Sequence, residues 1–246
     1  MFIIGRNPVT EALKYNSGSI KKIVLLEGLS DSKIKEIIRI ADKKNIKVEL
    51  KVKKDFEKIL DKKDKSEGVS QGVIAETEEY SYVLLDTVLD KITVKDSSLL
   101  LILDEIQDPH NLGAVIRTSA ATGIDGIIIT EKNSAKVNHT VMKTSAGSAN
   151  KIDIVQSKNI YKTIEKLKNS GFKVLGTTLN AGISMYEINF KEKIAVVLGN
   201  EGEGIRKNIV KLCDEMFKIP IPGNVESLNV SVAVGVILYE AMRQKT

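Results

Sequence analysis

The sequence predicts an α/β protein: a C-terminal domain built on a mainly parallel sheet, preceded by a smaller β/α domain. From Leu99 onward, continuous apolar runs alternate with helical patterns, as is typical of parallel strands buried on both faces. The earlier part has strand and helix patterns of its own. The charge also divides the chain, since residues 1–75 carry 17 Lys/Arg and 11 Asp/Glu, residues 76–97 carry 2 and 6, and residues 98–246 carry 18 and 15. Two domains joined by an acidic segment are therefore expected.

The N-terminal domain, residues 1–76, is expected to contain three strands and a helix. Apolar residues recur at helical spacing between residues 33 and 45. The strands are expected at residues 21–26, 46–50 and 71–76. An acidic and less regular stretch follows over residues 77–97, which we expect to be a linker with a short helix around residues 84–89.

The second domain is expected to span residues 98–246. Its strand candidates are apolar runs at residues 99–105, 126–130, 152–156, 172–178 and 193–199. Helical patterns lie between several of these runs, and the chain closes with a long apolar helix; the ranges are 111–123, 159–171 and 227–244. The first of these helices is expected to end at Gly123, because glycine adopts the left-handed conformation that closes many helices.

Composition excludes several classes of protein. The chain has 246 residues, and no apolar run approaches the roughly 20 residues that a membrane span requires. Its first residues lack the basic segment and cleavage site of a signal peptide, so a cytoplasmic location is expected. The single cysteine, Cys213, rules out an internal disulfide and is expected to be buried and inert. No Cys/His cluster has metal-ligand spacing, so no metal is expected.

The net charge of +5 leaves two interpretations open. A basic leading domain favours a polyanionic partner, because lysines that neutralise phosphates release counterions. Lysine supplies 32 of the 37 basic residues, and a lysine-rich composition also produces solvated basic surfaces without such a partner.

The first irregular stretch is residues 104–119, DEIQDPHNLGAVIRTS. Pro109 predicts a turn, and Asn111 is expected to cap the helix that follows. Arg117 then falls among small and apolar residues of that helix, where a buried charge is costly unless it is paired or functional. A surface arginine or a structural ion pair is the alternative.

The second stretch is residues 198–207, LGNEGEGIRK, a glycine-rich turn after a strand. Its spacing matches neither GxGxxG nor the Walker pattern, and Glu201 and Glu203 would repel a phosphate. The pattern therefore suits a cationic or neutral ligand. Alternatively, the two glutamates accept hydrogen bonds from backbone amides at the start of a helix expected over 204–212.

The third stretch is residues 218–235, KIPIPGNVESLNVSVAVG, in which two prolines follow a strand end. Gly223 permits an unusual turn, and Ser227 and Asn229 stand where the last helix is expected to begin. Ser227 is either a plain helix cap or, together with Asn229, a polar contact for a ligand.

Three motifs, DPHNLGAVIRTSAATG, VVLGNEGEGIR and IPIPGNVESLNVSVA, resemble in order and spacing the signature motifs of the SpoU (TrmH) family of RNA ribose 2′-O-methyltransferases. The resemblance covers residues 98 to about 245. The segments GRNPVTEALK, KKIVLLEG and GVSQGVIAE resemble the ribosomal-protein-like substrate-binding domain of the family's large-subunit ribosomal RNA members.

This resemblance implies S-adenosylmethionine as the cofactor, whose sulfonium cation is compatible with an acid-bearing glycine loop. It also implies a SPOUT-type domain with a deep trefoil knot, an exception to un-knotted topology, and a homodimer with the site near the interface. The implied catalytic positions are Asn111, Arg117, Glu201, Ser227 and Asn229. The implied cofactor contacts are Thr178, Gly199, Ile219 and Leu228.

A guanidinium stays charged in proteins, so we expect Arg117 to stabilise the developing alkoxide or to bind the adjacent phosphate rather than to act as a base. Glu201 would orient Arg117 or accept the proton, and Ser227 and Asn229 would fix the loop and the ribose. His110 is not a catalytic position of the family and is expected at the loop surface.

The expected substrate is a guanosine of large-subunit (23S) ribosomal RNA, because a separate basic domain favours ribosomal RNA over the minimal transfer-RNA enzymes. The alternatives are transfer RNA, another ribosomal RNA site, or an RNA-binding module without catalysis. Intact Arg117, Glu201 and Asn229 argue against the last of these.

Overall fold

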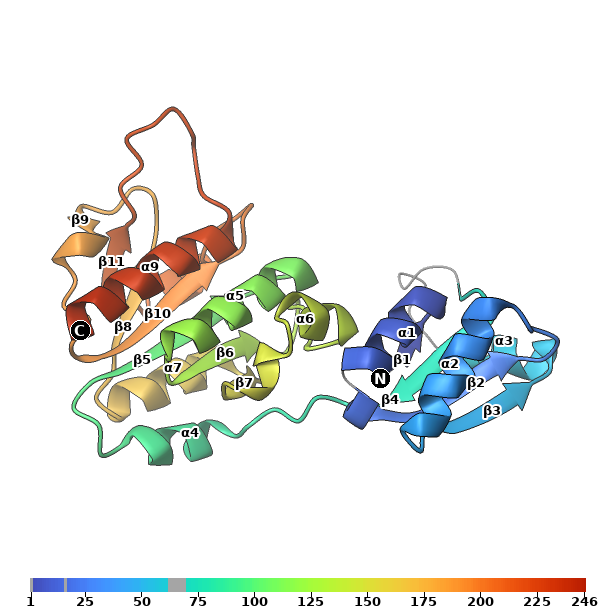
Figure 1. The fold of residues 1–246 in the computed structure, drawn as a ribbon. Helices are drawn as coiled ribbons and strands as arrows, with labels where there is room; N and C mark the ends of the chain where they lie inside the picture. Colours follow the sequence, from blue (N-terminus) through green and yellow to red (C-terminus); the bar gives the residue numbers. More distant parts are fainter. Residues whose placement is uncertain (1, 16, 62–69) are drawn as a thin grey trace. The chain divides into compact units, whose positions relative to one another are not determined.

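The computed structural model describes residues 2–15, 17–61 and 70–246, and the chain divides into two compact units, Met1–Tyr80 and Ser81–Thr246. Each unit has its own sheet with helices packed against it (Figure 1).

The N-terminal unit contains a four-stranded sheet in the order β1-β4-β2-β3. Strands β2 and β3 are parallel, and β4 is antiparallel to β1 and β2. The elements are β1 (Phe2–Ile4), α1 (Arg6–Tyr15), β2 (Ile20–Leu26), α2 (Ser32–Lys43), β3 (Lys47–Lys51), α3 (Lys53–Asp61) and β4 (Val73–Thr77). The three expected strands and the expected helix are confirmed to within two residues.

Alternating side chains give this sheet two buried faces. Ile23 and Leu25 of β2 pack in one cluster with residues of α1 and α2, whereas Val24 packs in another with Phe56 of α3. Strand β1 and helices α1 and α3 were not expected from the sequence. In α3 the reason is its composition, KKDFEKILD, in which charged residues outnumber the three apolar ones that reach the sheet.

The C-terminal unit is built on a seven-stranded sheet in the order β7-β6-β5-β10-β8-β11-β9, in which every neighbouring pair is parallel. Its strands are β5 (Ser98–Asp104), β6 (Gly126–Thr130), β7 (Ile154–Ser157), β8 (Lys173–Thr177), β9 (Ile183–Ser184), β10 (Lys193–Gly199) and β11 (Glu215–Lys218). Its helices are α4 (Leu85–Ile92), α5 (Pro109–Thr122), α6 (His139–Thr144), α7 (Ile160–Asn169), α8 (Lys207–Val210) and α9 (Val230–Lys245). The expected parallel α/β architecture is confirmed, and the trefoil knot stays a prediction.

Helices cover both faces of this sheet (Figure 1). Buried residues of α4, α7 and α8 form one hydrophobic cluster with alternate residues of the strands. Helices α5 and α9 pack against each other on the other face. Gly123 closes α5 in the left-handed conformation, with φ of 68°, as expected.

Residues 81–97 differ from the expected linker, because they belong to the C-terminal unit. The short helix expected there is α4, and its residues Val88, Leu89 and Ile92 are buried in the hydrophobic cluster. The acidic composition suggested a linker, but Asp86 and Asp90 occupy the exposed side of an amphipathic helix. The helix expected over 204–212 is also shorter, Lys207–Val210, because Ile205 is buried and Arg206 is held by an ion pair.

Candidate active site

The sheet order brings the three irregular stretches together. Strands β5, β10, β8 and β11 are neighbours and parallel, so the loops that follow them meet at one edge of the sheet. Those loops contain the three motifs and the turn after β8. The carboxyl edge of a parallel sheet is where such folds bind ligands, and this edge carries all the predicted site residues except Arg117.

The glycine-rich loop after β10 folds back on itself. A Cβ on Gly199 would lie 1.9 Å from the carbonyl carbon of Gly204 and 2.1 Å from its oxygen, so only glycine fits at this position. The carbonyl of Asn200 accepts a 3.0 Å hydrogen bond from the amide of Gly204, whose φ is +69°. The side-chain oxygen of Asn200 accepts further bonds from the amides of Gly202 and Glu203, at 3.0 and 2.7 Å. The close approach predicted for a glycine here is thus made by the chain itself.

An ion pair that the sequence analysis missed holds the far end of this loop. Asp104, fully buried at the end of β5, accepts hydrogen bonds from the backbone amide and from Nε of Arg206, at 3.0 and 2.9 Å. The guanidinium of Arg206 also lies 2.8 Å from the carboxylate of Glu105. Hydrogen bonding to Asp104 raises the pKa of Arg206 above its ordinary value. The pair therefore joins the first and second irregular stretches across 102 positions of sequence.

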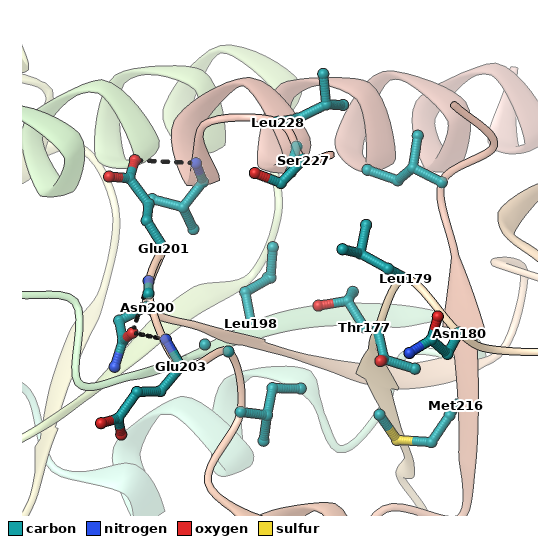
Figure 2. A pocket seen from close by; sticks show the side chains of 18 of the residues that line it. Thr177, Leu179, Asn180, Leu198, Asn200, Glu201, Glu203, Met216, Ser227 and Leu228 are labelled. Atoms are coloured by element: carbon teal, nitrogen blue, oxygen red, sulfur yellow. Dashed lines mark hydrogen bonds between the residues drawn. The ribbon is translucent and has the colours of Figure 1, made fainter. Parts of the chain in front are cut away.

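A second polar cluster joins all three motifs through Glu201. Its Oε1 accepts hydrogen bonds from Nδ2 of Asn111, at 2.9 Å, and from Nδ2 of Asn229. The two asparagines are themselves joined, because Nδ2 of Asn229 also lies 3.0 Å from Oδ1 of Asn111. The amide of Val230 donates to the same Oε1 at 3.4 Å (Figure 2). Three of the five predicted catalytic residues are thus in direct contact.

The structure corrects the predicted helix caps. Asp108, not Asn111, caps α5: its side chain accepts from the amide of His110, and Pro109 occupies the first turn. Proline at that position is the signal that could have identified the preceding aspartate. At the start of α9 the cap is Asn229, which accepts from the amide of Ser231 at 2.9 Å, so Ser227 is not the cap.

The glutamates also differ from the alternative role considered for them. Glu201 accepts from a backbone amide at the start of α9, not at the start of α8. Glu203 is exposed, and its own amide is held by Asn200.

Arg117 is not part of the cluster within one chain. Six residues turn an α-helix by about 600°, which places Arg117 about 120° around α5 from Asn111. Its side chain is exposed, and among the described residues it forms no ion pair or hydrogen bond. Glu201, expected to orient it, is bound to the asparagines instead. Because Arg117 is exposed, the free-energy cost expected for a buried charge does not arise in a single chain.

A cavity of about 420 Å³ opens between the glycine-rich loop, the turn after β8 and the loop before α9 (Figure 2). Its lining includes all four predicted cofactor contacts, Thr178, Gly199, Ile219 and Leu228. It also includes Ser227, a predicted catalytic residue that lies outside the Glu201 cluster. Apolar side chains such as Leu198, Ile221 and Met216 form much of its surface, with Glu201 and Glu203 on one side. A bent, partly apolar ligand that carries a positive charge fits such a lining.

A second cavity, of about 490 Å³, lies against the same loop and shares Asn200, Glu201, Gly202 and Glu203 with the first. Val230 also lines both cavities, and the remaining walls of the second come from residues 105–108 and Asn111. The loop is therefore a wall common to two cavities, and Glu201 belongs to both.

His110 and Cys213, the other two reactive side chains considered from the sequence, are not part of this site. His110 is exposed at the start of α5, as expected. Cys213 is half-buried, and burial raises the pKa of its thiol to about 11, so it is a poor nucleophile.

Over residues 2–15, 17–61 and 70–246, no group of His, Cys, Asp or Glu side chains is placed to hold a metal ion. Within the same residues, no helix is long and apolar enough to cross a membrane.

Comparison with known proteins identifies the family. Residues 98–239 match the SpoU rRNA Methylase family, and residues 2–83 match the RNA 2′-O ribose methyltransferase substrate-binding family. The chain belongs to the SpoU rRNA methylase family. The expected enzyme class, an RNA ribose methyltransferase, is thereby confirmed, together with the resemblance of both parts of the chain.

Relatives match this SpoU methylase along its whole length. A TrmH-family tRNA/rRNA methyltransferase of Staphylococcus aureus (strain MSSA476) is 37% identical over 99% of this chain and 96% of the relative. The 23S rRNA (guanosine-2′-O-)-methyltransferase RlmB of Pseudomonas aeruginosa is 35% identical over the same shares. The crystal structure of an AdoMet-bound rRNA methyltransferase from Sinorhizobium meliloti, 26% identical, superimposes with a TM-score of 0.64 over 98% of this chain and 86% of that one.

Proposed function

We propose that this SpoU methylase transfers a methyl group from S-adenosylmethionine to the ribose 2′-hydroxyl of a guanosine in 23S ribosomal RNA. The proposal depends most on one observation: residues of all three family motifs converge on Glu201 beside a cavity that suits the cofactor. The full-length similarity to a 23S rRNA guanosine methyltransferase supports the choice of nucleotide and RNA.

The first cavity fits the cofactor in shape and chemistry. S-adenosylmethionine, when bound, supplies a methyl group on a positively charged sulfur. The cavity offers apolar contacts from Leu198, Ile219 and Leu228, and backbone groups of the glycine-rich loop. Glu201 and Glu203 give it negative charge, which favours a cation and disfavours the phosphates of a dinucleotide. Thr178 and Gly199 line the same cavity, in accord with the contacts proposed for them.

Glu201 is the proposed proton acceptor for the ribose hydroxyl. Its Oε1 accepts from Asn111, Asn229 and the amide of Val230, so those donors fix the carboxylate in one orientation. Its Oε2 has no partner among the described residues and can accept a hydrogen bond from a substrate hydroxyl. Asn111 and Asn229 would then be positioning residues, and Ser227, at the rim of the cofactor cavity, would contact the ribose or its loop.

The second cavity is the proposed entrance for the acceptor nucleotide. Asn111 and Glu201 both line it, and the glycine-rich loop lies between it and the cofactor cavity. A hydroxyl that enters there meets the carboxylate first, and the loop separates the two substrates except near Glu201.

Arg117 is proposed to act from a second subunit. It is exposed and about 120° around α5 from Asn111, so it cannot reach Glu201 without a large movement of its helix. A homodimer in which α5 and α9 face the partner would direct Arg117 toward the partner's site, where its charge would stabilise the developing alkoxide or bind a phosphate. The exposed apolar residues Val232, Tyr239 and Met242 of α9 support this interface. A helix that is apolar on nearly every side is normally covered.

Mapping 2′-O-methylation along 23S ribosomal RNA in cells with and without the gene tests the substrate. One guanosine should lose its methyl group in the deletion strain and regain it when the gene is restored. A restored copy with Glu201→Gln should not regain it if the carboxylate accepts the proton. Loss of methylation in transfer RNA alone would refute the choice of ribosomal RNA, and no loss anywhere would favour a non-catalytic module.

A further inference from the structure

The described part of the N-terminal unit presents cations on two surfaces that differ in how they are neutralised. Around β3 and α3, three exposed lysines lie next to acids: Lys47 is 2.9 Å from Glu49, Lys58 is 2.9 Å from Asp55, and Lys53 is 3.9 Å from Glu57. These lysines compensate charges of their own surface, and they are not free to neutralise another molecule without breaking ion pairs.

Helix α2 presents the second surface. Lys35, Arg39 and Lys43 follow one another at intervals of four residues, so they form a single row along the helix, with about 6 Å of rise between successive positions. All three are exposed. Within residues 2–15, 17–61 and 70–80, none of the three has an ion-pair or hydrogen-bond partner. We call this row the α2 cation row.

Acids lie near the row without pairing to it. Glu36 is held by Lys14 at 2.7 Å and by Lys33 at 3.9 Å, and its pKa is lowered chiefly by Lys14 and only weakly by Arg39. Asp42 is exposed on the same helix and lies beyond ion-pair distance of all three cations. The row therefore keeps its positive charge.

The row is also held rigidly. Ile34, Ile37 and Ala41 on the opposite side of α2 are buried in the core of the unit. Asp31 caps the helix by accepting from the amides of Lys33 and Ile34, at 3.1 and 3.3 Å. The helix backbone is therefore fixed, so the three positions keep a regular spacing, which favours a regularly charged partner.

We infer that the α2 cation row binds the sugar–phosphate backbone of the RNA substrate, and that the paired lysines Lys47, Lys53 and Lys58 do not. This inference rests on the proposed function, since it adds the surface through which the N-terminal unit holds RNA. Backbone contacts of this kind position an RNA without reading its sequence. They suit a unit that lies outside the catalytic motifs and contains no tryptophan for base stacking.

The test compares two triple variants of the full-length protein. One carries Lys35→Gln, Arg39→Gln and Lys43→Gln; the matched control carries Lys47→Gln, Lys53→Gln and Lys58→Gln. Both remove three exposed cations, so they change the net charge equally. The dissociation constant for a 23S ribosomal RNA transcript is measured between 50 and 200 mM salt. The dissociation constant for S-adenosylmethionine and the Tm are measured for every protein.

The row variant should reduce the slope of log K against log salt by about 2, the counterion release expected from three single-strand phosphate contacts. The control should keep the wild-type slope, and both should keep wild-type Tm and cofactor affinity. Equal loss of slope in both variants would overturn the inference, because only net charge would matter. An unchanged slope in the row variant would also overturn it and would leave the row to an acidic protein partner. Failure of the wild-type protein to bind the transcript would instead refute the proposed function, and the inference with it.

Discussion

Removing the charge of Asp104 should loosen the glycine-rich loop and lower the stability of the C-terminal unit. Asp104→Asn keeps the shape of the side chain but replaces one oxygen by an NH₂ group that faces the donors of Arg206. The carboxylate is fully buried and receives the backbone amide, Nε and Nη2 of Arg206. The substitution therefore removes an ion pair and places donors against donors.

The expected cost is about 3 kcal/mol. Breaking a buried ion pair from one side typically costs about 3–5 kcal/mol. The lower end applies here because 34% of the Arg206 side chain is exposed and Glu105 still accepts from it. At about 2–4 °C per kcal/mol for a unit of this size, the Tm should fall by about 6–12 °C. If about 1.4 kcal/mol of the loss appears as disorder of the loop, cofactor affinity falls about tenfold.

Scanning calorimetry and titration with S-adenosylmethionine measure both effects. Asp90→Asn is the control, since Asp90 is an exposed residue of α4 in the same unit. Arg206→Lys should be intermediate, because lysine keeps the charge but loses the planar fork that binds two oxygens. A Tm of Asp104→Asn within 2 °C of the wild-type value would refute the assigned role of the pair.

Four further outcomes are expected. Arg117→Ala should lower single-turnover methyl transfer by about 10² or more while cofactor affinity and Tm stay unchanged, and Arg117→Lys should restore it only in part; near-normal turnover would exclude a catalytic role. Gly199→Ala should lower cofactor affinity far more than Gly202→Ala, because the new Cβ of the first meets backbone at 1.9 Å and that of the second meets its nearest atom at 3.7 Å; equal affinities would contradict this. Cys213 should react with iodoacetamide at pH 8 about a hundredfold more slowly in the folded than in the unfolded chain, because its pKa is raised to about 11; equal rates would contradict the burial. Glu240→Gln should cost about 1 kcal/mol at pH 7, since Arg243 and Gln244 lower the pKa of Glu240 to about 2 and Arg243 is largely exposed. The stabilisation by this ion pair is present above the ordinary pKa of 4.5 and is lost as pH falls toward 2. The difference in Tm between the wild-type protein and Glu240→Gln should therefore narrow below pH 4.5, and a difference that widened there would argue against the pair.

The place of the first two motifs could be predicted from the sequence, because each follows an apolar run, whereas the third follows the short strand β11, whose sequence EMFK is not an apolar run. Parallel strands end at a common edge, so three loops after three strands converge whenever the strands are neighbours. The contacts within the site could not be predicted in this way. Nothing in the spacing of Glu201, Asn111 and Asn229 indicates that one oxygen accepts from both asparagines.

Two of the missed residues, Asp104 and Arg206, have roles that depend on partners distant in the sequence. Asp104 looks like the polar end of a buried strand, and Arg206 looks like a residue in the first turn of the helix expected over 204–212. Only the adjacency of β5 and β10 joins them. Arg117 shows the opposite case. Its apolar neighbours in sequence suggested burial, but α5 turns it outward, where its surroundings depend on molecules beyond the single chain.

The two glutamates of the glycine-rich loop can be explained by the ligands that the cavities on the two sides of the loop must exclude. Glu203 is exposed and lines both cavities, and Glu201 does so while it joins the three motifs. In the proposed function, their charge repels phosphates from the place where the methyl group is delivered. An RNA substrate can therefore present only a neutral ribose at that point, and its phosphates must be held by cations elsewhere. The unpaired cations Arg117 and the α2 cation row are free to do so, and a loop with two carboxylates is compatible with an RNA enzyme for that reason.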